Sequence, residues 1–268
     1  MTQQTKGFAL VTGASSGIGA VYADRLARRG YDLILTARRA DRLQVLAERI
    51  MAETGRQVET VVADLSNRGD LRRVENLLGA DPRISLLVNN AGLAAVTPLL
   101  SSDVDAMSDI VSLNIDALMR LTYVAAPKFV ERGAGTIINI ASVVGIAPET
   151  LNGVYGASKS FVLAFSQSLK HELADKGVRV QVVLPGATAT EIWANAGMPV
   201  ENLPKEIVMS AEDMVDAALA GLDKGEFVTI PALADIGQWD AFEHARQALS
   251  PNLSRSAPAT RYGLTLAA

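Results

Sequence analysis

The stretch Thr12–Gly19, "TGASSGIG", decides how the beginning of this chain folds. It follows the apolar, strand-like run Phe8–Gly13 and leads into a segment of helical period. Glycine permits a tight turn and a close approach of the backbone to a ligand, and the free N–H groups at a helix N-terminus attract phosphate. The stretch therefore predicts a strand–turn–helix unit that binds the pyrophosphate of a dinucleotide, with an ordinary glycine-rich turn as the alternative.

Strand-like and helix-like segments alternate along the rest of the chain. Several strand-like runs are almost wholly apolar, which is typical of parallel strands covered on both faces. The seven runs are Phe8–Gly13, Tyr31–Ala37, Gln57–Asp64, Ile84–Gly92, Gly135–Ser142, Val178–Gly186 and Glu226–Pro231. The alternation predicts a doubly wound (Rossmann) α/β fold, a seven-stranded parallel sheet with helices on both faces, in which ligands bind at the carboxyl ends of the strands.

Neither an internal repeat nor a low-complexity linker divides the sequence. We therefore expect a single domain over residues 1–250, which binds the dinucleotide and carries catalysis. Residues 251–268 have no regular period and are expected to form an irregular C-terminal tail.

The composition excludes several classes of function. The 268 residues carry a formal net charge of −4 and no cysteine. An acidic chain lacks the basic surface that nucleic acids and anionic membranes require, and without cysteine there is no disulfide or thiolate chemistry. His171 and His244 show no ligand-like spacing, so no metal site is predicted. The start has no signal-peptide pattern, and no apolar run approaches the roughly 20 residues that span a bilayer, so a cytoplasmic protein is expected.

The second strand-like run ends in "LTARR", with Arg38 and Arg39 and no acid before Asp41. A guanidinium binds phosphate through paired hydrogen bonds, whereas a carboxylate at this position accepts the ribose 2′-hydroxyl of NAD. We predict NADP(H) in preference to NAD(H), with Arg38 as the principal contact of the 2′-phosphate and Ser15 as a helper. The alternative is that both arginines belong to a solvated helix start.

Tyr155 and Lys159 lie four residues apart where a helix is expected to begin, so their side chains share one face. A nearby ammonium favours the phenolate and predicts a pKa for Tyr155 below the ordinary value of about 10. Such a phenol exchanges protons effectively near neutral pH. The alternative is a core tyrosine beside a lysine whose amine reaches the solvent.

The chain resembles the short-chain dehydrogenase/reductase family through seven motifs, which occur in the family's order. They are "TGASSGIG", "ADL" (Ala63–Leu65), "NNAG" (Asn89–Gly92), Asn114, Ser142, "YGASK" (Tyr155–Lys159) and "PGATAT" (Pro185–Thr190). The resemblance extends from about Lys6 to Pro231 and departs slightly at Ala141, where a second serine is common. It implies reversible carbonyl reduction, in which a nicotinamide transfers the hydride and Tyr155 the proton.

The resemblance assigns catalysis to Ser142, Tyr155, Lys159 and Asn114, the last holding a water in a proton relay. It implies that the cofactor contacts Gly13, Ser15, Ser16, Gly17, Ile18, Gly19, Arg38, Asp64, Leu65, Asn90, Ala91, Gly92, Tyr155, Lys159, Pro185, Gly186, Thr188 and Thr190. Plainer alternatives are a helix N-cap for Asp64, a turn role for Ser142 and an exposed helix position for Asn114, although the apolar neighbours of Asn114 indicate partial burial.

Residues 187–207, rich in Gly, Pro and Asn, lie where the resemblance places a mobile substrate loop. Trp193 from this loop is expected to line a substrate site with Ile146 and Asn152, next to Ser142 and Tyr155; loop packing is the alternative for Trp193. The loop holds no cluster of positive charge, so the expected substrate is an apolar ketone, aldehyde or secondary alcohol. The resemblance also implies a homodimer or homotetramer.

The resulting prediction is an NADP(H)-dependent oxidoreductase. The alternatives are an NAD-dependent dehydrogenase, a nucleotide-binding scaffold protein without catalysis, and a sugar-nucleotide epimerase or dehydratase. The complete set of Asn114, Ser142, Tyr155 and Lys159 favours an enzyme over a scaffold, and the spacing of the glycines disfavours an epimerase.

Overall fold

A computed structural model describes residues 5–264 of the chain. The chain divides into two compact units, Met1–Pro231 and Ala232–Ala268. The first unit contains the whole sheet and every predicted site residue. The second, as far as residue 264, contains helix α9 (Gly237–Ala248) and two short 3₁₀ turns, Ser250–Asn252 and Thr260–Tyr262. The division at residue 250 expected from the sequence stays a prediction.

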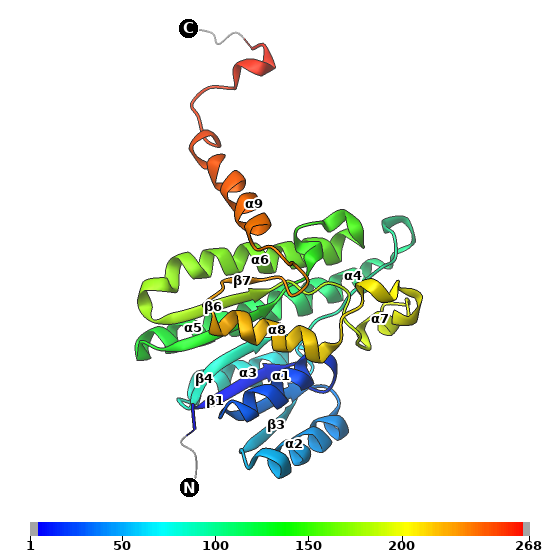
Figure 1. Ribbon diagram of the computed structural model, residues 1–268, viewed down its shortest axis with the longest axis vertical. Coiled ribbons are helices and arrows are strands. Elements are labelled where there is room, and N and C mark those ends of the chain that lie inside the picture. The colour runs from blue at the N-terminus through cyan, green and yellow to red at the C-terminus, as the bar shows by residue number, and fades with distance from the viewer. Residues whose placement is uncertain (1–4, 265–268) are drawn as a thin grey trace. The chain divides into compact units, whose positions relative to one another are not determined.

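The first unit is built on one sheet of parallel strands in the order β3-β2-β1-β4-β5-β6-β7 (Figure 1). The strands are β1 (Phe8–Thr12), β2 (Asp32–Ala37), β3 (Val58–Val62), β4 (Ile84–Asn89), β5 (Gly135–Ile140), β6 (Val178–Val183) and β7 (Val228–Thr229). The predicted seven-stranded, doubly wound sheet is confirmed. Only the last strand is much shorter than its sequence pattern, since pairing with β6 covers two residues.

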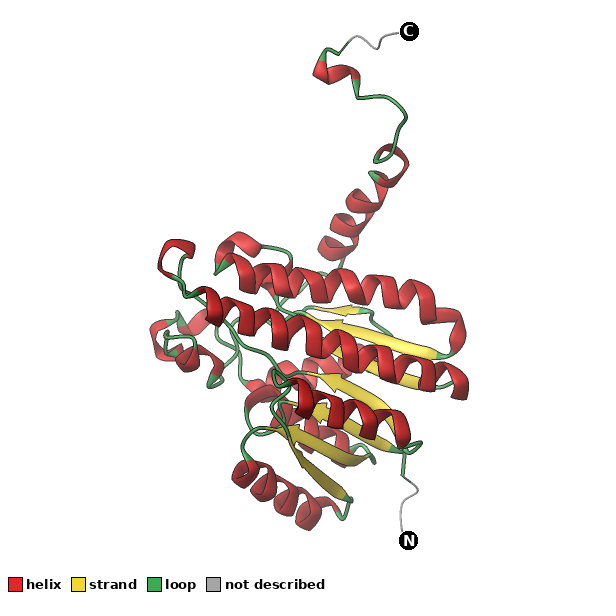
Figure 2. Ribbon diagram, turned by 180° about the vertical axis from the view of Figure 1, so that it is seen from behind, coloured by secondary structure: helices red, strands yellow, loops and turns green. Residues whose placement is uncertain are grey.

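Helices cover both faces of the sheet, as Figures 1 and 2 show from opposite sides. One layer consists of α1 (Gly17–Arg28), α2 (Ala40–Thr54) and α8 (Ala211–Asp223). The other consists of α3 (Arg68–Ala80), α5 (Leu118–Arg132) and α6 (Gly153–Leu173). The remaining helices of this unit that bear on the site are α4 (Val104–Val111), a π-helical turn (Ser112–Ala117) and the short α7 (Ile192–Asn195).

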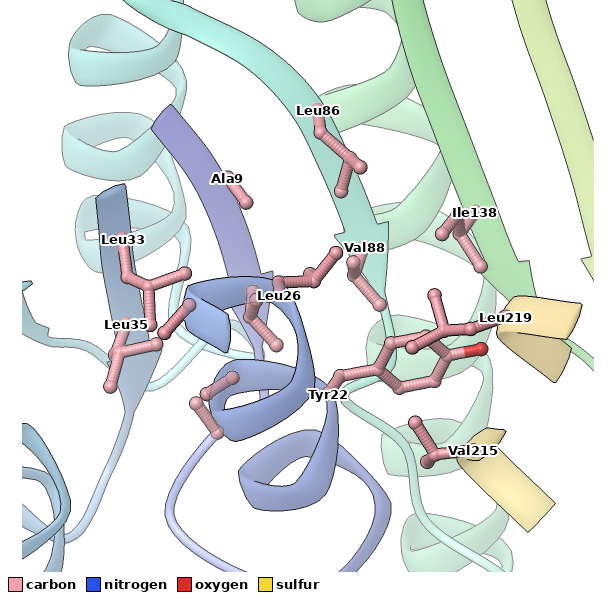
Figure 3. Packing of buried hydrophobic residues seen from close by; sticks show 14 of the residues in the cluster. Ala9, Tyr22, Leu26, Leu33, Leu35, Leu86, Val88, Ile138, Val215 and Leu219 are labelled. Carbon is pink, nitrogen blue, oxygen red and sulfur yellow. The ribbon is translucent and has the colours of Figure 1, made fainter. Parts of the chain in front are cut away.

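The side chains of each central strand alternate between the two layers, because successive residues of a strand point to opposite faces. In β1, Ala9 and Val11 pack under α1 and α8, whereas Phe8 and Leu10 pack under the opposite layer. Figure 3 shows the first of these cores, where Tyr22 of α1 lies between the sheet and α8. Burying a side chain such as Val11, Phe8 or Leu10 contributes roughly 1.5–3 kcal/mol, so the sheet and its two helix layers hold together.

The strand order reverses between β1 and β4, which are neighbours although they are far apart in the sequence. In open α/β sheets a ligand binds outside the carboxyl ends of the strands at such a reversal. The loops after β1 and β4 are Thr12–Gly19 and Asn89–Gly92, two of the predicted cofactor motifs. The topology therefore brings them to one edge of the sheet.

No helix within residues 5–264 is both long and apolar enough to cross a bilayer.

Candidate active site

The hydroxyl of Thr12 ties the ends of β1 and β4 together. It accepts hydrogen bonds from the backbone N–H groups of Asn90 (2.9 Å) and Ala91 (3.0 Å) and donates one to the carbonyl oxygen of Val88 (3.2 Å). The Asn90 side chain donates back to the Thr12 carbonyl oxygen over 2.8 Å. The structure thus joins Thr12–Gly19, called the phosphate loop below after its predicted role, to the "NNAG" motif through buried and partly buried hydrogen bonds that fix their relative position.

The glycines of the phosphate loop are required by close packing. A Cβ atom on Gly19 would lie 2.4 Å from the carbonyl oxygen of Gly13, and one on Gly13 would lie 2.9 Å from the Cα atom of Ala91. Gly17 has a φ of +53°, and a Cβ there would lie 2.9 Å from Cγ2 of Thr190. The first and last cofactor motifs of the sequence therefore meet at the N-terminus of α1, where free N–H groups suit a pyrophosphate.

Ser142, Tyr155 and Lys159 meet at the carboxyl end of β5. The Ser142 hydroxyl donates to the carbonyl oxygen of Pro185 (3.3 Å) and forms a hydrogen bond with the Tyr155 phenol. The Lys159 ammonium donates to the carbonyl oxygen of Ile140 (3.0 Å) and lies 5.9 Å from the centre of the Tyr155 ring. All three side chains are buried, so Lys159 does not reach the solvent as the alternative interpretation required.

The local sequence explains why α6 begins where Tyr155 falls in its first turn. Asn152 caps the helix, because its side-chain oxygen accepts from the N–H groups of Val154 (2.9 Å) and Tyr155 (3.3 Å). Its amide nitrogen donates to the Thr97 carbonyl oxygen (2.6 Å), which ties the helix start to the loop after β4. These contacts give Asn152 a structural role, and its predicted contact with substrate stays a prediction.

The pKa values in this cluster correct one prediction from the sequence. The pKa of Tyr155 is raised above its ordinary value, mainly by burial, and the hydrogen bond with Ser142 opposes this only in part. The expected lowering by Lys159 is wrong for this structure, because burial disfavours the charged phenolate more than its hydrogen bond favours it. Burial likewise lowers the pKa of Lys159, to about 8.

Asn114 is buried in the π-helical turn between α4 and α5. Its side-chain oxygen accepts from the N–H of Leu93 (2.8 Å), and its amide donates to the Leu93 carbonyl oxygen (2.9 Å) and the Ser158 hydroxyl (3.0 Å). A Cβ on Gly92 would lie 3.1 Å from Oδ1 of Asn114 and 3.6 Å from the Lys159 ammonium. Asn114 therefore lies beside the cluster of Ser142, Tyr155 and Lys159, and the exposed alternative is wrong.

The two consecutive arginines after β2 occupy different places. Arg38 is two-thirds exposed, and its nearest ionic partner is Asp64 at 4.0 Å. Arg39 instead turns toward the phosphate loop, where its Nη2 donates to the hydroxyls of Ser16 (2.7 Å) and Ser15 (3.4 Å). The sequence had singled out Arg38 with Ser15, but the structure pairs Ser15 with Arg39.

Arg39 also contacts Glu191, which the sequence analysis did not single out. Its Nη1 donates to Glu191 over 2.8 Å, and Arg42 donates to the other oxygen of the same carboxylate over 2.6 Å. No sequence signal links these residues, because Glu191 lies about 150 positions beyond α2.

Three further predicted residues have defined surroundings. Asp64 does not cap α3, whose N-cap is Asn67, but accepts from the N–H of Ser66 (2.9 Å). Leu65 is buried in the core under α3 and α5. The indole of Trp193 donates to the Thr188 carbonyl oxygen (2.9 Å), a contact within its own loop that agrees with the loop-packing alternative.

Other predicted positions are placed at the same edge of the sheet. Ile146 is partly buried after the 3₁₀ turn that follows Ser142, Pro185 and Thr188 are buried after β6, and Gly186 between them is exposed. Ile18 packs against the core under α1.

Over residues 5–264, no group of three or more His, Cys, Asp or Glu side chains is arranged to hold a metal ion.

Comparisons with known proteins agree with this architecture. Residues 7–200 match the family model of the short chain dehydrogenases, so the chain belongs to that family. It is 41% identical over 186 residues to a sulfoacetaldehyde reductase of Chromohalobacter salexigens, a match that covers 68% of this chain and 73% of the relative.

Two solved structures are similar over nearly the whole chain. A short-chain dehydrogenase from Sphingobium yanoikuyae in complex with NADPH is 48% identical, with a TM-score of 0.93 over 96% of this chain and 99% of the other. A bulky-bulky ketone specific alcohol dehydrogenase from Comamonas testosteroni is 42% identical, with a TM-score of 0.89 over 97% of this chain and 99% of the other. The chain is thus an oxidoreductase of CH–OH and C=O groups that uses NAD(P).

Proposed function

We propose that this chain is an NADP(H)-dependent enzyme that interconverts ketones and secondary alcohols, with Tyr155 as the general acid and base. The observation that carries the proposal is the buried cluster of Ser142, Tyr155 and Lys159 beside the glycine-rich loop. Proton transfer requires a phenol within hydrogen-bond reach of the substrate oxygen, and Ser142 is the hydroxyl that already bonds to this phenol.

Different residues hold the substrate, transfer the proton and bind the cofactor. A bound nicotinamide supplies the hydride chemistry. In reduction, the Ser142 hydroxyl holds the carbonyl oxygen and the Tyr155 phenol donates a proton to it; in oxidation the phenolate accepts the proton. Lys159 holds the ribose hydroxyls of the cofactor and stabilises the phenolate when it is charged. Asn114 positions Ser158 and the segment at Leu93 next to this cluster.

The preference for NADP(H) is part of the proposal. Arg38 and Arg39 follow β2, where the adenosine ribose binds in folds of this kind. Two guanidiniums offer the paired, charge-assisted hydrogen bonds that a 2′-phosphate accepts. The NADPH complex of the Sphingobium yanoikuyae relative supports this choice. The phosphate loop supports the binding of the rest of the dinucleotide, since Gly13, Gly17 and Gly19 allow the close packing that brings the N-terminus of α1 to the same edge as Thr190 and Asn90.

The substrate class we propose is a ketone with bulky apolar groups on both sides of the carbonyl. The Comamonas testosteroni relative is described as specific for such ketones. The charged residues of segment 187–207 are Glu191, Glu201, Lys205 and Glu206, an excess of negative charge. This disfavours an anionic substrate, although a reductase of sulfoacetaldehyde is among the relatives.

We further propose a homodimer or homotetramer that works in the cytoplasm. Tyr123 of α5 and Phe165 of α6 have parallel rings 6.2 Å apart, and Phe161 stacks on Phe165 at 5.6 Å. Tyr123 is exposed, as is Val111 of α4. Exposed apolar side chains on neighbouring helices favour a contact with another protein surface, and a second copy of the chain is the partner that symmetry favours.

The test follows NADPH oxidation by its absorbance with a panel of bulky ketones, simple aldehydes and sulfoacetaldehyde. Wild type is expected to reduce bulky ketones best, and Tyr155→Phe to lose 10²–10⁴-fold or more in kcat while NADPH still binds. Near-normal rates in Tyr155→Phe would overturn the role of the phenol. NADPH binding without turnover of any substrate would support the scaffold alternative, and equal use of NADH would support the NAD-dependent one.

A further inference from the structure

Glu191 connects segment 187–207 to Arg39, which precedes α2, and to Arg42 in its first turn. It lies at the start of segment 187–207, next to Thr190, which packs on Gly17 of the phosphate loop. One carboxylate oxygen accepts from Arg39 (2.8 Å) and the other from Arg42 (2.6 Å). These hydrogen bonds hold the pKa of Glu191 below its usual range, so it is a carboxylate throughout the neutral pH range.

The guanidinium of Arg39 donates hydrogen bonds from both of its sides. Its Nε and Nη2 atoms face the hydroxyls of Ser15 and Ser16 in the phosphate loop, and its Nη1 atom faces Glu191. A phosphate that binds at this guanidinium meets a negative charge already held there. The side chains of Arg39, Arg42 and Glu191 are each about 40–50% exposed, so water screens the ion pairs without removing them.

We propose that Glu191 is a specificity-determining residue, whose carboxylate competes with the 2′-phosphate of the cofactor for the guanidiniums of Arg39 and Arg42. This rests on the proposed binding of NADP(H) beside Arg38 and Arg39. NADH carries a neutral hydroxyl in place of the phosphate, so the competition penalises NADPH alone. Glu191 thereby lowers the ratio of NADPH affinity to NADH affinity that the arginines create.

The test measures dissociation constants of the full-length wild type and variants for NADPH, NADH, 2′-AMP and 5′-AMP. Glu191→Gln removes the charge and keeps the shape, and it is expected to tighten NADPH and 2′-AMP about two- to fivefold, the size typical of a half-exposed charge pair. NADH and 5′-AMP should change less than twofold. Glu191→Asp keeps the charge and should resemble wild type, and so should Glu201→Gln, a matched control in the same segment.

Weaker NADPH binding by Glu191→Gln would overturn the proposal, because it would mean that Glu191 positions Arg39 instead of competing for it. Equal changes for NADPH and NADH would overturn it as well, since the effect would not depend on the 2′-phosphate. A wild type that binds NADPH no better than NADH would contradict the proposed cofactor preference itself. A wild type that prefers NADPH while Glu191→Gln has no effect would overturn only the role of Glu191.

Discussion

The ammonium of Lys159 donates a hydrogen bond of 3.0 Å to the backbone carbonyl oxygen of Ile140, which joins α6 to the end of β5. The same lysine is buried, and burial lowers its pKa to about 8 from an ordinary value of 10.5. Helix α6 is thus held in place by an amine that is costly to charge. Buried groups with shifted pKa values are common at the functional sites of enzymes.

Lys159→Met should stabilise the nucleotide-free protein at pH 7, and this advantage should shrink as the pH rises. A lysine whose folded-state pKa is depressed disfavours folding below pH 8, and the penalty disappears between pH 8 and the unfolded pKa near 10.5. The difference in unfolding free energy between variant and wild type should fall by about 3 kcal/mol over that window. Urea denaturation at pH 7 and pH 10 measures it.

The control for this prediction is Lys224→Met, the same substitution at an exposed position, measured in the same way. A difference between Lys159→Met and wild type that stays constant from pH 7 to pH 10 would show that the ammonium is not desolvated.

Tyr155 in the nucleotide-free protein should titrate above the ordinary pKa of tyrosine, and Ser142→Ala should raise its pKa further. Burial disfavours the phenolate, and the Ser142 hydroxyl favours it through a hydrogen bond. The tyrosinate absorbance of wild type minus that of Tyr155→Phe isolates this residue. Ser142→Thr, which retains a hydroxyl, is the matched control, and a Tyr155 pKa below 9 would restore the prediction made from the sequence.

Gly17→Ala should weaken NADPH binding by roughly tenfold or more and destabilise the protein by about 1–2 kcal/mol. The residue has a φ of +53°, and its new Cβ would press on Thr190 at 2.9 Å. Gly55→Ala is the control, because Gly55 has a similar φ of +68° but open space around it. It should lose stability by the same mechanism without any change in NADPH binding, measured by fluorescence titration.

Arg39→Gln should weaken NADPH binding about three- to tenfold and leave NADH binding unchanged, because the proposed charged donor to the 2′-phosphate is lost. The Arg39 side chain is partly exposed, and solvent screening limits the size of the effect. Arg38→Gln tests the residue chosen from the sequence by the same titration. Arg72→Gln, an exposed arginine of α3, is the control. A loss in Arg39→Gln that is equal for the two cofactors would remove Arg39 from phosphate recognition.

Much of the fold follows from local patterns. The apolar runs at β1, β2 and β4 predicted parallel strands, and the glycines of Thr12–Gly19 predicted the turn into α1. The periods of strands and helices depend on residues that are close together in the sequence. They are therefore the same in any fold that covers both faces of the sheet. The shared face of Tyr155 and Lys159 was likewise visible, because a helix of known period places i and i+4 on one face, whereas Ser142 was assigned only through the family resemblance.

The sequence by itself indicated a parallel sheet covered on both faces, the glycine turn and the shared helix face of Tyr155 and Lys159, all of which depend on neighbours along the chain. Only the tertiary structure decided that Arg39 faces Ser15 and Ser16, and that Glu191 meets Arg39 and Arg42. It also reversed the expected pKa shift of Tyr155. Burial and long-range ion pairs arise from segments that meet only after the chain has folded, and these set the charge of a site.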